Sequence, residues 1–340
     1  ALEASRGMAD RGDAWSPGWF DLELSPGGSV EILASAGPSI GRVASPGALL
    51  AEREPAAPGG DAFLDRLRVA SRAFLAKRGK GRTVIAGYPW FLDWGRDTLI
   101  AARGLLAAGW GEEVRRLLLT FGALEDRGTL PNTLSAESTA NRDTSDAPLW
   151  FALACEEAAR ALGTGLYTQP VDGTRNLGGV LRSIAEHYLA GTPNGIRVDP
   201  ASGLVWSPAH FTWMDTNYPA GTPREGYPIE IQALWIRLLR QLERLEPGAW
   251  KGPAELATAS LDRFWREDAG CFADALHAPA GMPAEQAAPD DHLRPNQLFA
   301  ISLGLVAEER ARRIVAACAR HLLIPGALRS LAPLSVAYPL

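Results

Sequence analysis

Apolar side chains recur at i, i+3 and i+4 along most of the chain, which is the spacing that places them on one face of an α-helix. Segments with this spacing predict nine helices, at residues 61–78, 97–109, 111–124, 146–163, 176–190, 226–246, 252–266, 294–306 and 307–322. Hardly any part of residues 61–340 shows the period of two that is typical of a strand. The pattern therefore predicts an all-α domain over residues 61–340.

The connections between these helices are of two kinds. Short helix-to-helix turns alternate with long segments rich in Trp, Gly, Pro, Asn and Asp, at residues 79–96, 125–145, 191–225 and 267–293. Connections longer than about 12–15 residues in a compact domain usually have a functional role. We therefore predict a toroid of helix hairpins whose long loops surround a central pocket. An α-solenoid scaffold is the alternative, although it would show a fixed repeat and short loops.

The residues before position 61 have a different pattern. Residues 15–36 alternate apolar and polar positions on both sides of Pro26-Gly27-Gly28, which predicts a β-hairpin. Pro and Gly then recur at 37–38, 46–47 and 58–60, and these residue types interrupt regular structure. The pattern predicts a short β-rich segment that a linker joins to the helical domain.

Composition and charge narrow the class of protein. The 340 residues carry a net charge of -5, with 46% hydrophobic and 21% charged residues. This balance is typical of an ordered protein and argues against a nucleic acid or an anionic membrane as partner, since both attract basic surfaces. No stretch approaches the roughly 18–20 apolar residues of a membrane span, and the first residues lack the apolar region of a signal peptide. We therefore expect a soluble, cytoplasmic protein.

The cysteines and histidines form no pattern of a disulfide framework or a metal site. Cys155, Cys271 and Cys318 are odd in number and widely spaced, which is typical of reduced, buried thiols. None of the five histidines lies four residues from another or next to a cysteine. We therefore expect neither a metal nor another cofactor.

A first candidate site precedes the predicted helix at 97–109. Residues 88–97 combine two tryptophans with an arginine and two aspartates, and Trp94, Arg96 and Asp97 stand at the end of this run. Aromatic faces beside charged donors and acceptors suit a polyhydroxylated ligand, whose ring C–H faces stack on tryptophan while its hydroxyls bind the charged groups. The alternative is a helix N-cap at Asp97 with buried tryptophan beside it.

A second candidate site lies in the longest connection, where aromatic residues surround Asp215 in the run Trp213-Met214-Asp215. Burial among aromatic rings would raise the pKa of this carboxyl and suit it to general acid catalysis; capping of a neighbouring turn is the alternative. Charged and amide residues also open the helices that begin near Glu230 and Arg294. They could face one mouth of a pocket, or each could simply favour the start of its own helix.

These residues resemble the C-terminal catalytic domain of glycogen debranching enzymes, the amylo-α-1,6-glucosidase family. The matching motifs occur in family order over roughly residues 61–335. They are Phe91-Leu92-Asp93-Trp94-Gly95-Arg96-Asp97, Pro131-Asn132-Thr133, Thr144-Ser145-Asp146-Ala147-Pro148-Leu149-Trp150-Phe151, Trp213-Met214-Asp215, Glu230-Ile231-Gln232-Ala233-Leu234-Trp235 and Leu293-Arg294-Pro295-Asn296-Gln297.

The resemblance implies an (α/α)6 barrel, in agreement with the helical pattern. Residues 15–36 are similar to the tail of a β-rich domain that precedes this barrel in bacterial members. The implied organisation is a β-rich tail over 1–48, a linker over 49–60 and the catalytic domain over 61–340, with the last helices of the barrel missing.

The resemblance also implies an activity and a set of site residues. Family members release glucose from α-1,6 branch points of glycogen or related α-glucans with inversion, so an α-glucan is the expected partner. Asp215 matches the general acid, Arg96 and Asp97 match the pair that holds the terminal glucose, and Trp94 and Trp213 match pocket walls. Further substrate-binding positions are Asp146, Glu230, Gln232, Arg294 and Asn296. Six of the 11 tryptophans would then lie in or beside the sugar site, namely Trp90, Trp94, Trp150, Trp206, Trp213 and Trp235.

Inversion also requires a second carboxylate, roughly 6.5–9.5 Å from the acid, to act as base. The resemblance places this base in a family motif that would follow residues 328–333, whereas the sequence stops at Leu340. We expect the base outside the given residues and keep Glu230 as the alternative within them. Two further hypotheses are a barrel hydrolase of another linkage, trehalase-like or glucoamylase-like, and a carbohydrate-binding homologue without activity.

Overall fold

The computed structural model describes residues 11, 16, 18–30, 32, 60–87, 91–134, 141–216 and 222–337. The chain divides into two compact units, Ala1–Ala57 and Pro58–Leu340. In the first unit Pro26 and Gly27 form a turn, in which the Gly28 N–H donates to the Ser25 carbonyl over 2.8 Å. The described residues of this unit include no strand, so the predicted hairpin is present there as a turn alone. Residues 15, 17, 31 and 33–36 of the predicted hairpin lie outside the described residues.

The described part of the second unit contains nine α-helices, one in each of the segments that the sequence predicted. They are α3 (Ala62–Ala73), α4 (Gly95–Ala107), α5 (Gly111–Ala123), α6 (Ala147–Leu162), α7 (Leu177–Ala190), α8 (Ile229–Leu245), α9 (Lys251–Ala259), α10 (Leu298–Ser302) and α11 (Glu308–His321). The helical periodicity of the sequence therefore located every one of these helices.

Several predicted helices were too long. In the segment 61–78 the helix ends at Ala73, and the chain continues as the strand Leu75–Arg78. Gly79, with a φ of 55°, then forms the turn of a hairpin. The segment 226–246 begins with a strand that ends at Pro228, and α8 starts directly after it. The segments 252–266 and 294–306 are partly 3-10 helix, at Ser260–Phe264 and Pro295–Gln297.

The prediction of an all-α domain was also incomplete, because short antiparallel strands occur throughout the described residues. Five two-stranded sheets are β1 (Leu75–Arg78) with β2 (Gly81–Val84), β3 (Asp93–Trp94) with β4 (Thr133–Leu134), β5 (Arg197–Val198) with β6 (Val205–Trp206), β8 (Trp265–Arg266) with β9 (Cys271–Phe272), and β12 (Leu323–Ile324) with β13 (Ala327–Leu328). One three-stranded sheet has the order β11 (Ala288–Pro289), β10 (Ala275–His277), β7 (Gly226–Pro228). Apart from β1 and β2, which have four residues each, these strands have two or three residues and are too short to produce a visible alternation in sequence.

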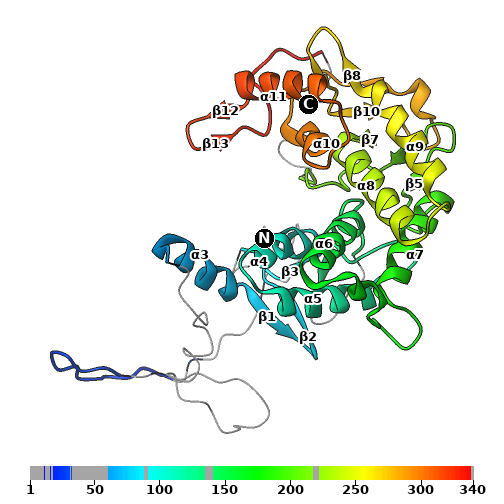
Figure 1. The fold of residues 1–340 in the computed structure, drawn as a ribbon. Helices are drawn as coiled ribbons and strands as arrows, with labels where there is room; N and C mark the ends of the chain where they lie inside the picture. The colour runs from blue at the N-terminus through cyan, green and yellow to red at the C-terminus, as the bar shows by residue number, and fades with distance from the viewer. Residues whose placement is uncertain are drawn as a thin grey trace. The chain divides into compact units, whose positions relative to one another are not determined.

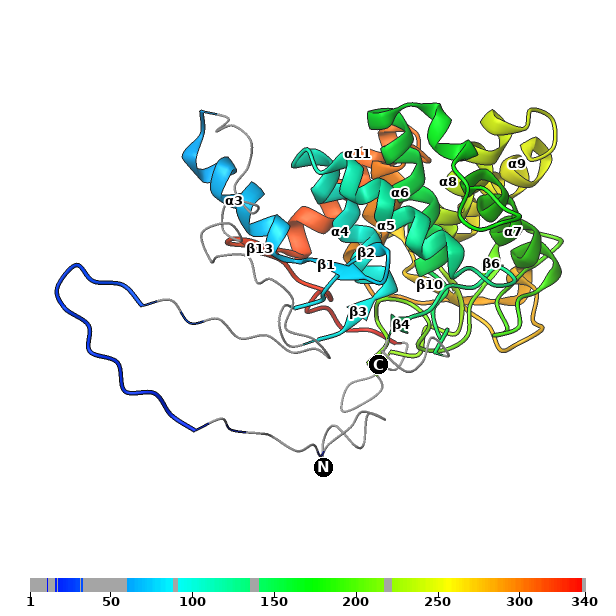
Figure 2. The ribbon, with the colours of Figure 1, turned by 90° about the horizontal axis from the view of Figure 1, so that it is seen from below.

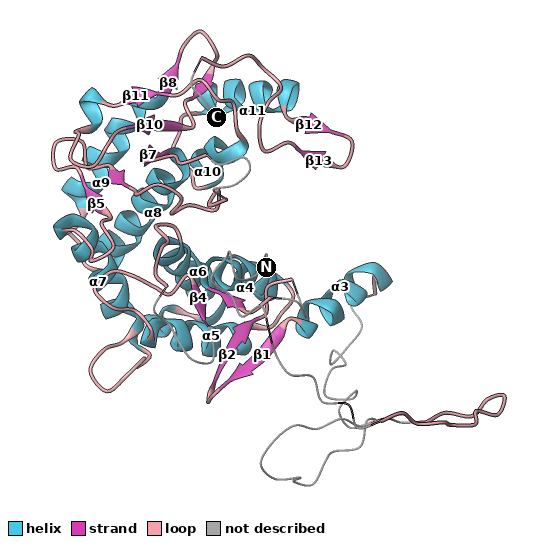
Figure 3. Cartoon of the chain, turned by 180° about the vertical axis from the view of Figure 1, so that it is seen from behind, coloured by secondary structure: helices cyan, strands magenta, loops and turns pink. Residues whose placement is uncertain are grey.

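The helices of the second unit form an inner and an outer row (Figure 1). In the inner row, α4 packs against α6, α6 against α8, and α8 against α10. Each inner helix also contacts the helix that follows it in the chain, so that α5, α7, α9 and α11 form the outer row. The secondary-structure view shows the same alternation from behind (Figure 3). Inner and outer helices alternate along the chain, as in a toroid of helix hairpins.

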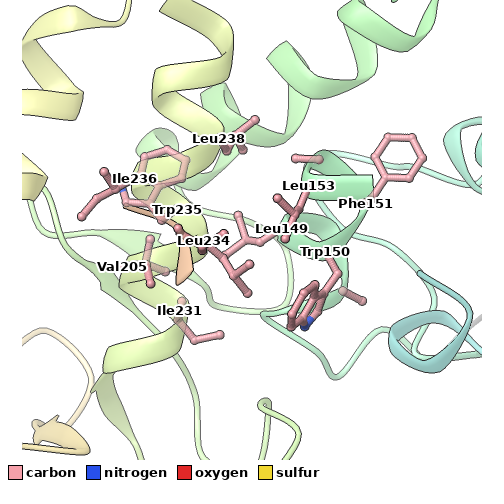
Figure 4. Close-up of a cluster of buried hydrophobic side chains, with 14 of the residues drawn as sticks. Leu149, Trp150, Phe151, Leu153, Val205, Ile231, Leu234, Trp235, Ile236 and Leu238 are labelled. Carbon is pink, nitrogen blue, oxygen red and sulfur yellow. The ribbon is translucent and has the colours of Figure 1, made fainter. Parts of the chain in front are cut away.

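Burial follows this arrangement. The inner helices α6 and α8 bury side chains on every face, which is typical of helices enclosed by protein. Figure 4 shows Leu149 of α6 beside Leu234 of α8 in the layer between them. In contrast, the outer helix α11 buries Ile314 and Cys318, and its other side chains are at least partly exposed. Cys318 is one of the three free cysteines, all of which are buried as expected.

The connections place the polar loops at one end of the helices. Residues 108–110, 246–250 and 303–307 link an inner helix to the next outer helix, and all three are short. Three longer connections, at residues 124–146, 191–228 and 260–297, lead from an outer helix to the N-terminal end of the next inner helix and contain short strands. The link from α6 to α7, at residues 163–176, is the longer exception among the inner-to-outer links and contains a 3-10 helix. Figure 2 shows β3, β4, β6 and β10 at one end of the helices. The N-terminal ends of the inner helices therefore carry the long loops.

Candidate functional site

One cavity joins the N-terminal ends of the inner helices. It has a volume of about 440 Å³. Its polar lining comes from Asp146 at the start of α6, Glu230 in the first turn of α8 and Asn296 in the 3-10 helix before α10. Aromatic side chains complete it, including Trp150 and Trp213. Acidic and amide groups from three separate segments thus face the same space.

The helix α4 contributes Arg96, whose position depends on a close backbone approach. The preceding residue, Gly95, donates its N–H to the Asn132 carbonyl over 2.9 Å. A Cβ atom on Gly95 would lie 2.3 Å from the Pro131 carbonyl oxygen, so the start of α4 packs directly against the segment before β4. Glycine is required here because no side chain fits between the two backbones.

The guanidinium of Arg96 joins two carboxylates. Its Nε donates to Asp146 Oδ2 over 2.6 Å, and its Nη1 donates to Asp215 Oδ2 over 3.1 Å. Burial lowers the pKa of Arg96, but the charges and hydrogen bonds of Asp146 and Asp215 outweigh it, so the pKa is raised overall. The third nitrogen, Nη2, is buried and has no hydrogen-bond partner among the described residues. The two N–H groups of Nη2 are therefore unpaired among the described residues and could bind a ligand oxygen.

The carboxyl of Asp146 is directed away from its own helix. Asp146 occupies the N-cap of α6, yet its side chain makes no capping hydrogen bond. Instead it accepts from Thr144 Oγ1 over 2.7 Å and from Arg96. The side chain is almost completely buried, and a cap would stabilise the helix start by about 1 kcal/mol. The structure uses this aspartate to hold Arg96.

Asp97 lies in the first turn of α4 and lines a second, larger groove of about 960 Å³ together with Arg96 and Trp213. Because α4 begins at Gly95, Asp97 is not the N-cap that the sequence offered as an alternative. Burial raises the pKa of Asp97, and the charge of Arg96 beside it acts in the opposite direction.

The Trp213–Asp215 segment lies at the edge of the cavity. The Asp215 side chain is 35% exposed and pairs with Arg96, so in this structure it is not enclosed by aromatic rings as the sequence suggested. Trp213 is 41% exposed. Its indole Nε1 donates to Asn296 Oδ1 over 2.8 Å. The structure therefore brings Asp215 together with Arg96 and Asp146, and Trp213 with Asn296.

Glu230, which lines the cavity, forms a buried ion pair with Arg224. This ion pair was not predicted from the sequence. Arg224 is fully buried, and its Nη2 donates to Glu230 Oε2 over 2.6 Å while Nη1 binds Glu230 Oε1. Its Nε donates to Asp274 Oδ2 over 2.7 Å. Burial lowers the pKa of Arg224, but Asp274 and Glu230 raise it well above its usual value. Neither Arg224 nor Asp274 belongs to a motif that the sequence analysis singled out, although both lie in its long connections.

Six predicted site residues do not line this cavity. Arg96 and Asp97 line the second groove instead, whereas Trp94, Asp215, Gln232 and Arg294 line neither. Gln232 accepts from the Val205 N–H over 2.7 Å and donates to the Val205 and Pro228 carbonyls over 2.9 and 3.0 Å. Arg294 is buried beside Asp274, with 3.6 Å between its Nε and Asp274 Oδ2. Trp94 pairs with Thr133 in the β3–β4 sheet and is the N-cap of α4.

Two of the tryptophans that the sequence analysis placed in or beside the sugar site pack in the protein core instead. Trp235 is fully buried, stacks on Tyr188 with 5.7 Å between ring centres, and donates to the Gly203 carbonyl over 3.0 Å. Trp206 is buried and donates to the Ala278 carbonyl over 2.9 Å. Trp150 and Trp213 are the tryptophans that line the cavity in the described part of the chain. Trp90 lies outside the described residues.

The described residues contain neither a metal-binding cluster nor a membrane-spanning helix. No group of three or more His, Cys, Asp or Glu side chains among them is arranged to hold a metal ion. No helix among them has both the length and the apolar character to cross a membrane.

Comparison with known proteins now identifies the family. The model of the family described as Amylo-alpha-1,6-glucosidase matches residues 69–339. The chain belongs to this family. The resemblance that the sequence motifs indicated is thereby confirmed, and the chain is a member of a glycoside hydrolase family.

Solved structures of glycoside hydrolases share the fold of this amylo-alpha-1,6-glucosidase family member. A GH78 family rhamnosidase of Bacillus sp. GL1 matches with a TM-score of 0.56 and 18% identity, covering 76% of this chain and 26% of that one. A rhamnosidase from Klebsiella oxytoca with rhamnose bound gives 0.51 and 16%, with coverages of 78% and 49%. The neutral trehalase of Saccharomyces cerevisiae gives 0.52 and 13%, with coverages of 74% and 57%. The chain therefore spans between a quarter and somewhat more than half of these proteins' lengths.

Proposed function

We propose that this family member hydrolyses α-1,6-linked glucose at branch points of glycogen or a related α-glucan, with inversion and with Asp215 as general acid. The observation that carries the proposal is the arrangement at Arg96, which holds Asp146 and Asp215 and keeps a buried Nη2 donor without a partner among the described residues. A buried, unsatisfied guanidinium donor is costly unless a ligand oxygen completes it. A sugar hydroxyl beside Trp213 would do so.

Binding of the sugar also prepares the acid in this mechanism. An ion pair favours the charged form of a carboxyl, whereas a general acid must carry a proton. We propose that the terminal glucose takes over the Arg96 Nη1 contact of Asp215. Released from the ion pair, the Asp215 carboxyl takes up a proton from solvent and delivers it to the glycosidic oxygen as the glycosidic bond breaks. A carboxylate on the opposite side of the ring accepts a proton from the water that attacks the anomeric carbon.

Glu230 lines the cavity and is the base that the sequence analysis kept as an alternative. Both of its oxygens already bind Arg224, so a water molecule would compete with a buried ion pair for them. We therefore propose that Glu230 anchors Arg224, and that the base is a carboxylate outside the described residues. We further propose that the inner and outer rows of helices belong to a closed (α/α)6 barrel, as the alternation of the rows supports.

The test is Asp215→Asn in the full chain, with glucose release from a branched limit dextrin as readout. Loss of the proton donor should lower kcat by about 10² to 10⁴-fold. Asp143→Asn is the matched control, because Asp143 is an exposed aspartate that lies three residues before Asp146. Near-normal turnover by Asp215→Asn would overturn the acid assignment.

Product analysis tests the linkage and the stereochemistry. The wild-type chain should release glucose from α-1,6 branches faster than from α-1,4 or α,α-1,1 substrates, and NMR of the first product should show β-glucose. Preference for another linkage would favour a trehalase-like or glucoamylase-like hydrolase. Binding of α-glucans without hydrolysis would favour a carbohydrate-binding homologue.

A further inference from the structure

A chain of hydrogen bonds connects a buried carboxylate to the edge of the cavity. Asp274 Oδ1 accepts from Asn296 Nδ2 over 2.8 Å. Asn296 Oδ1 in turn accepts from Trp213 Nε1, also over 2.8 Å. Asp274 and Asn296 are buried, whereas Trp213 is 41% exposed and stands two residues before Asp215. The three side chains thus lead from the protein interior to the segment that carries the proposed acid.

The chemistry of the two end groups fixes the direction of every bond in this chain. An ionised carboxylate can only accept hydrogen bonds, and an indole N–H can only donate them. The amide of Asn296 therefore has to turn its NH₂ toward Asp274 and its oxygen toward Trp213. The reverse orientation would place donor against donor at Trp213 and oxygen against oxygen at Asp274.

Asp274 is itself rigidly held. Its Oδ2 accepts from Arg224 Nε over 2.7 Å, and its own N–H donates to Asp290 Oδ1 over 3.0 Å. Arg224 makes a second connection to the same segment, because its Nη1 donates to Thr212 Oγ1 over 3.1 Å. Thr212 Oγ1 also accepts from the Met214 N–H over 3.2 Å. The segment before Asp215 is therefore attached to one buried cluster at two consecutive side chains.

We propose that Asp274 is a positioning residue, which acts through Asn296 and Trp213 to hold the Trp213–Asp215 segment where Asp215 meets the scissile bond. This inference rests on the proposed function, since it assigns Asp274 a task in delivering the proton of Asp215. Asp274 makes no hydrogen bond or ion pair with Arg96 or Asp215. Its effect therefore passes through the relay formed by Asp274, Asn296 and Trp213.

The relay can be broken and rebuilt by exchanging its polar groups. In Asp274→Asn the amide can still accept from Arg224, but its NH₂ then faces Asn296 and forces that amide to turn. The turned amide presents NH₂ to the indole N–H, and the last hydrogen bond is lost. Asn296→Asp places two carboxylates against each other. The double variant Asp274→Asn with Asn296→Asp restores both hydrogen bonds of the relay and the net charge. The new amide at position 274 donates to the new carboxylate at position 296, and this carboxylate accepts from Trp213.

Two readouts separate positioning from general stability. The first is the indole N–H resonance of Trp213 in a ¹H–¹⁵N spectrum, identified as the peak that Trp213→Phe removes. The second is the division of any kinetic effect between kcat and KM. Both are measured above the pKa of about 6 to which burial raises Asp274, where the carboxylate is ionised.

In Asp274→Asn the Trp213 resonance should move, and kcat should fall about 10- to 100-fold with a smaller change in KM, since misplacement by about 1 Å can cost 10²-fold. The double variant should recover both. Trp213→Phe leaves the buried cluster intact and breaks the last bond, so adding Asp274→Asn to it should lower kcat little further.

An unmoved Trp213 resonance in Asp274→Asn would overturn the proposal, and so would a restored resonance in the double variant without recovery of kcat. A loss of thermal stability with unchanged kcat would also overturn it, because Asp274 would then serve the fold alone. The proposed function can fail separately. If the wild-type chain hydrolyses no α-glucoside while the resonance responds as expected, the relay exists but has no acid to position.

Discussion

The close approach at Gly95 makes a quantitative prediction for the start of α4. Gly95→Ala adds a Cβ atom that would lie 2.3 Å from the Pro131 carbonyl oxygen. Carbon and oxygen atoms in weak contact stand roughly 3.3 Å apart. The two backbones must therefore separate by about 1 Å, and the side chain of the next residue, Arg96, moves with α4.

The expected cost has two parts. Overpacking of a well-packed region destabilises a protein by about 1 to 3 kcal/mol. Displacement of Arg96 by about 1 Å should lower kcat/KM by about 10²-fold, since both carboxylates of the site depend on its geometry. We expect a lower midpoint of urea-induced unfolding with an unchanged slope, because the fold itself is retained.

Gly104→Ala is the matched control on the same helix. A Cβ atom on Gly104 would meet nothing within 4 Å, and replacing a glycine inside a helix by alanine stabilises it by up to about 1 kcal/mol. The same substitution should thus destabilise the chain at residue 95 and leave it unchanged or more stable at residue 104. If both variants unfold at the wild-type urea concentration and keep full activity, α4 does not depend on the contact with Pro131.

Two further predictions concern buried polar groups. Gln232→Leu should lower the free energy of unfolding by about 1 to 3 kcal/mol. The reason is that the substitution removes the hydrogen bonds of this side chain to the backbone of Val205 and Pro228. A raised KM with unchanged stability would instead support the sugar-binding role predicted from the sequence. Burial raises the pKa of Asp274 to about 6, above the usual value of 3.8, so protonation favours the folded state. Stability from this group is present below pH 3.8 and is lost as the pH rises to about 6. The measurement is the free energy of unfolding of the wild type and of Asp274→Asn at several pH values between 3.8 and 6. The advantage of the wild type over the variant should fall as the pH rises. If that advantage increases instead, the charge of Arg224 outweighs burial.

The helical part of the fold could be predicted because its signal is local and repeated. An amphipathic or enclosed helix of three or more turns contains several apolar residues at the expected spacing, so α6 and α8 were found at nearly their full extent. The strands carried no such signal. Pairing of Asp93 with Leu134, or of Tyr227 with Leu276, joins residues far apart in sequence through two- or three-residue strands.

The candidate site also contains residues that could be predicted from the sequence and residues that could not. The residue types around Arg96 and Asp215 indicated their chemistry, and the resemblance to the family indicated Asp146. The structure brings the three side chains together. Arg224 and Asp274 could not be recognised from sequence, because a single arginine or aspartate in a long loop is usually a surface residue. Their function depends on complete burial and on each other, and both properties exist only in the folded chain.

The N-terminal ends of the inner helices explain why acidic groups can gather at the cavity and the groove. A helix N-terminus carries partial positive charge and favours a nearby carboxylate, and Asp97, Asp146 and Glu230 each lie at the start of such a helix. The same preference made the sequence ambiguous, since an acidic residue in this position is expected whether or not it has a further task. Side-chain direction resolves the ambiguity. The Asp146 side chain makes no capping hydrogen bond to its own helix and accepts one from Arg96 instead. The fold therefore places this carboxylate at the helix N-terminus, while its hydrogen bonds orient Arg96 in the site.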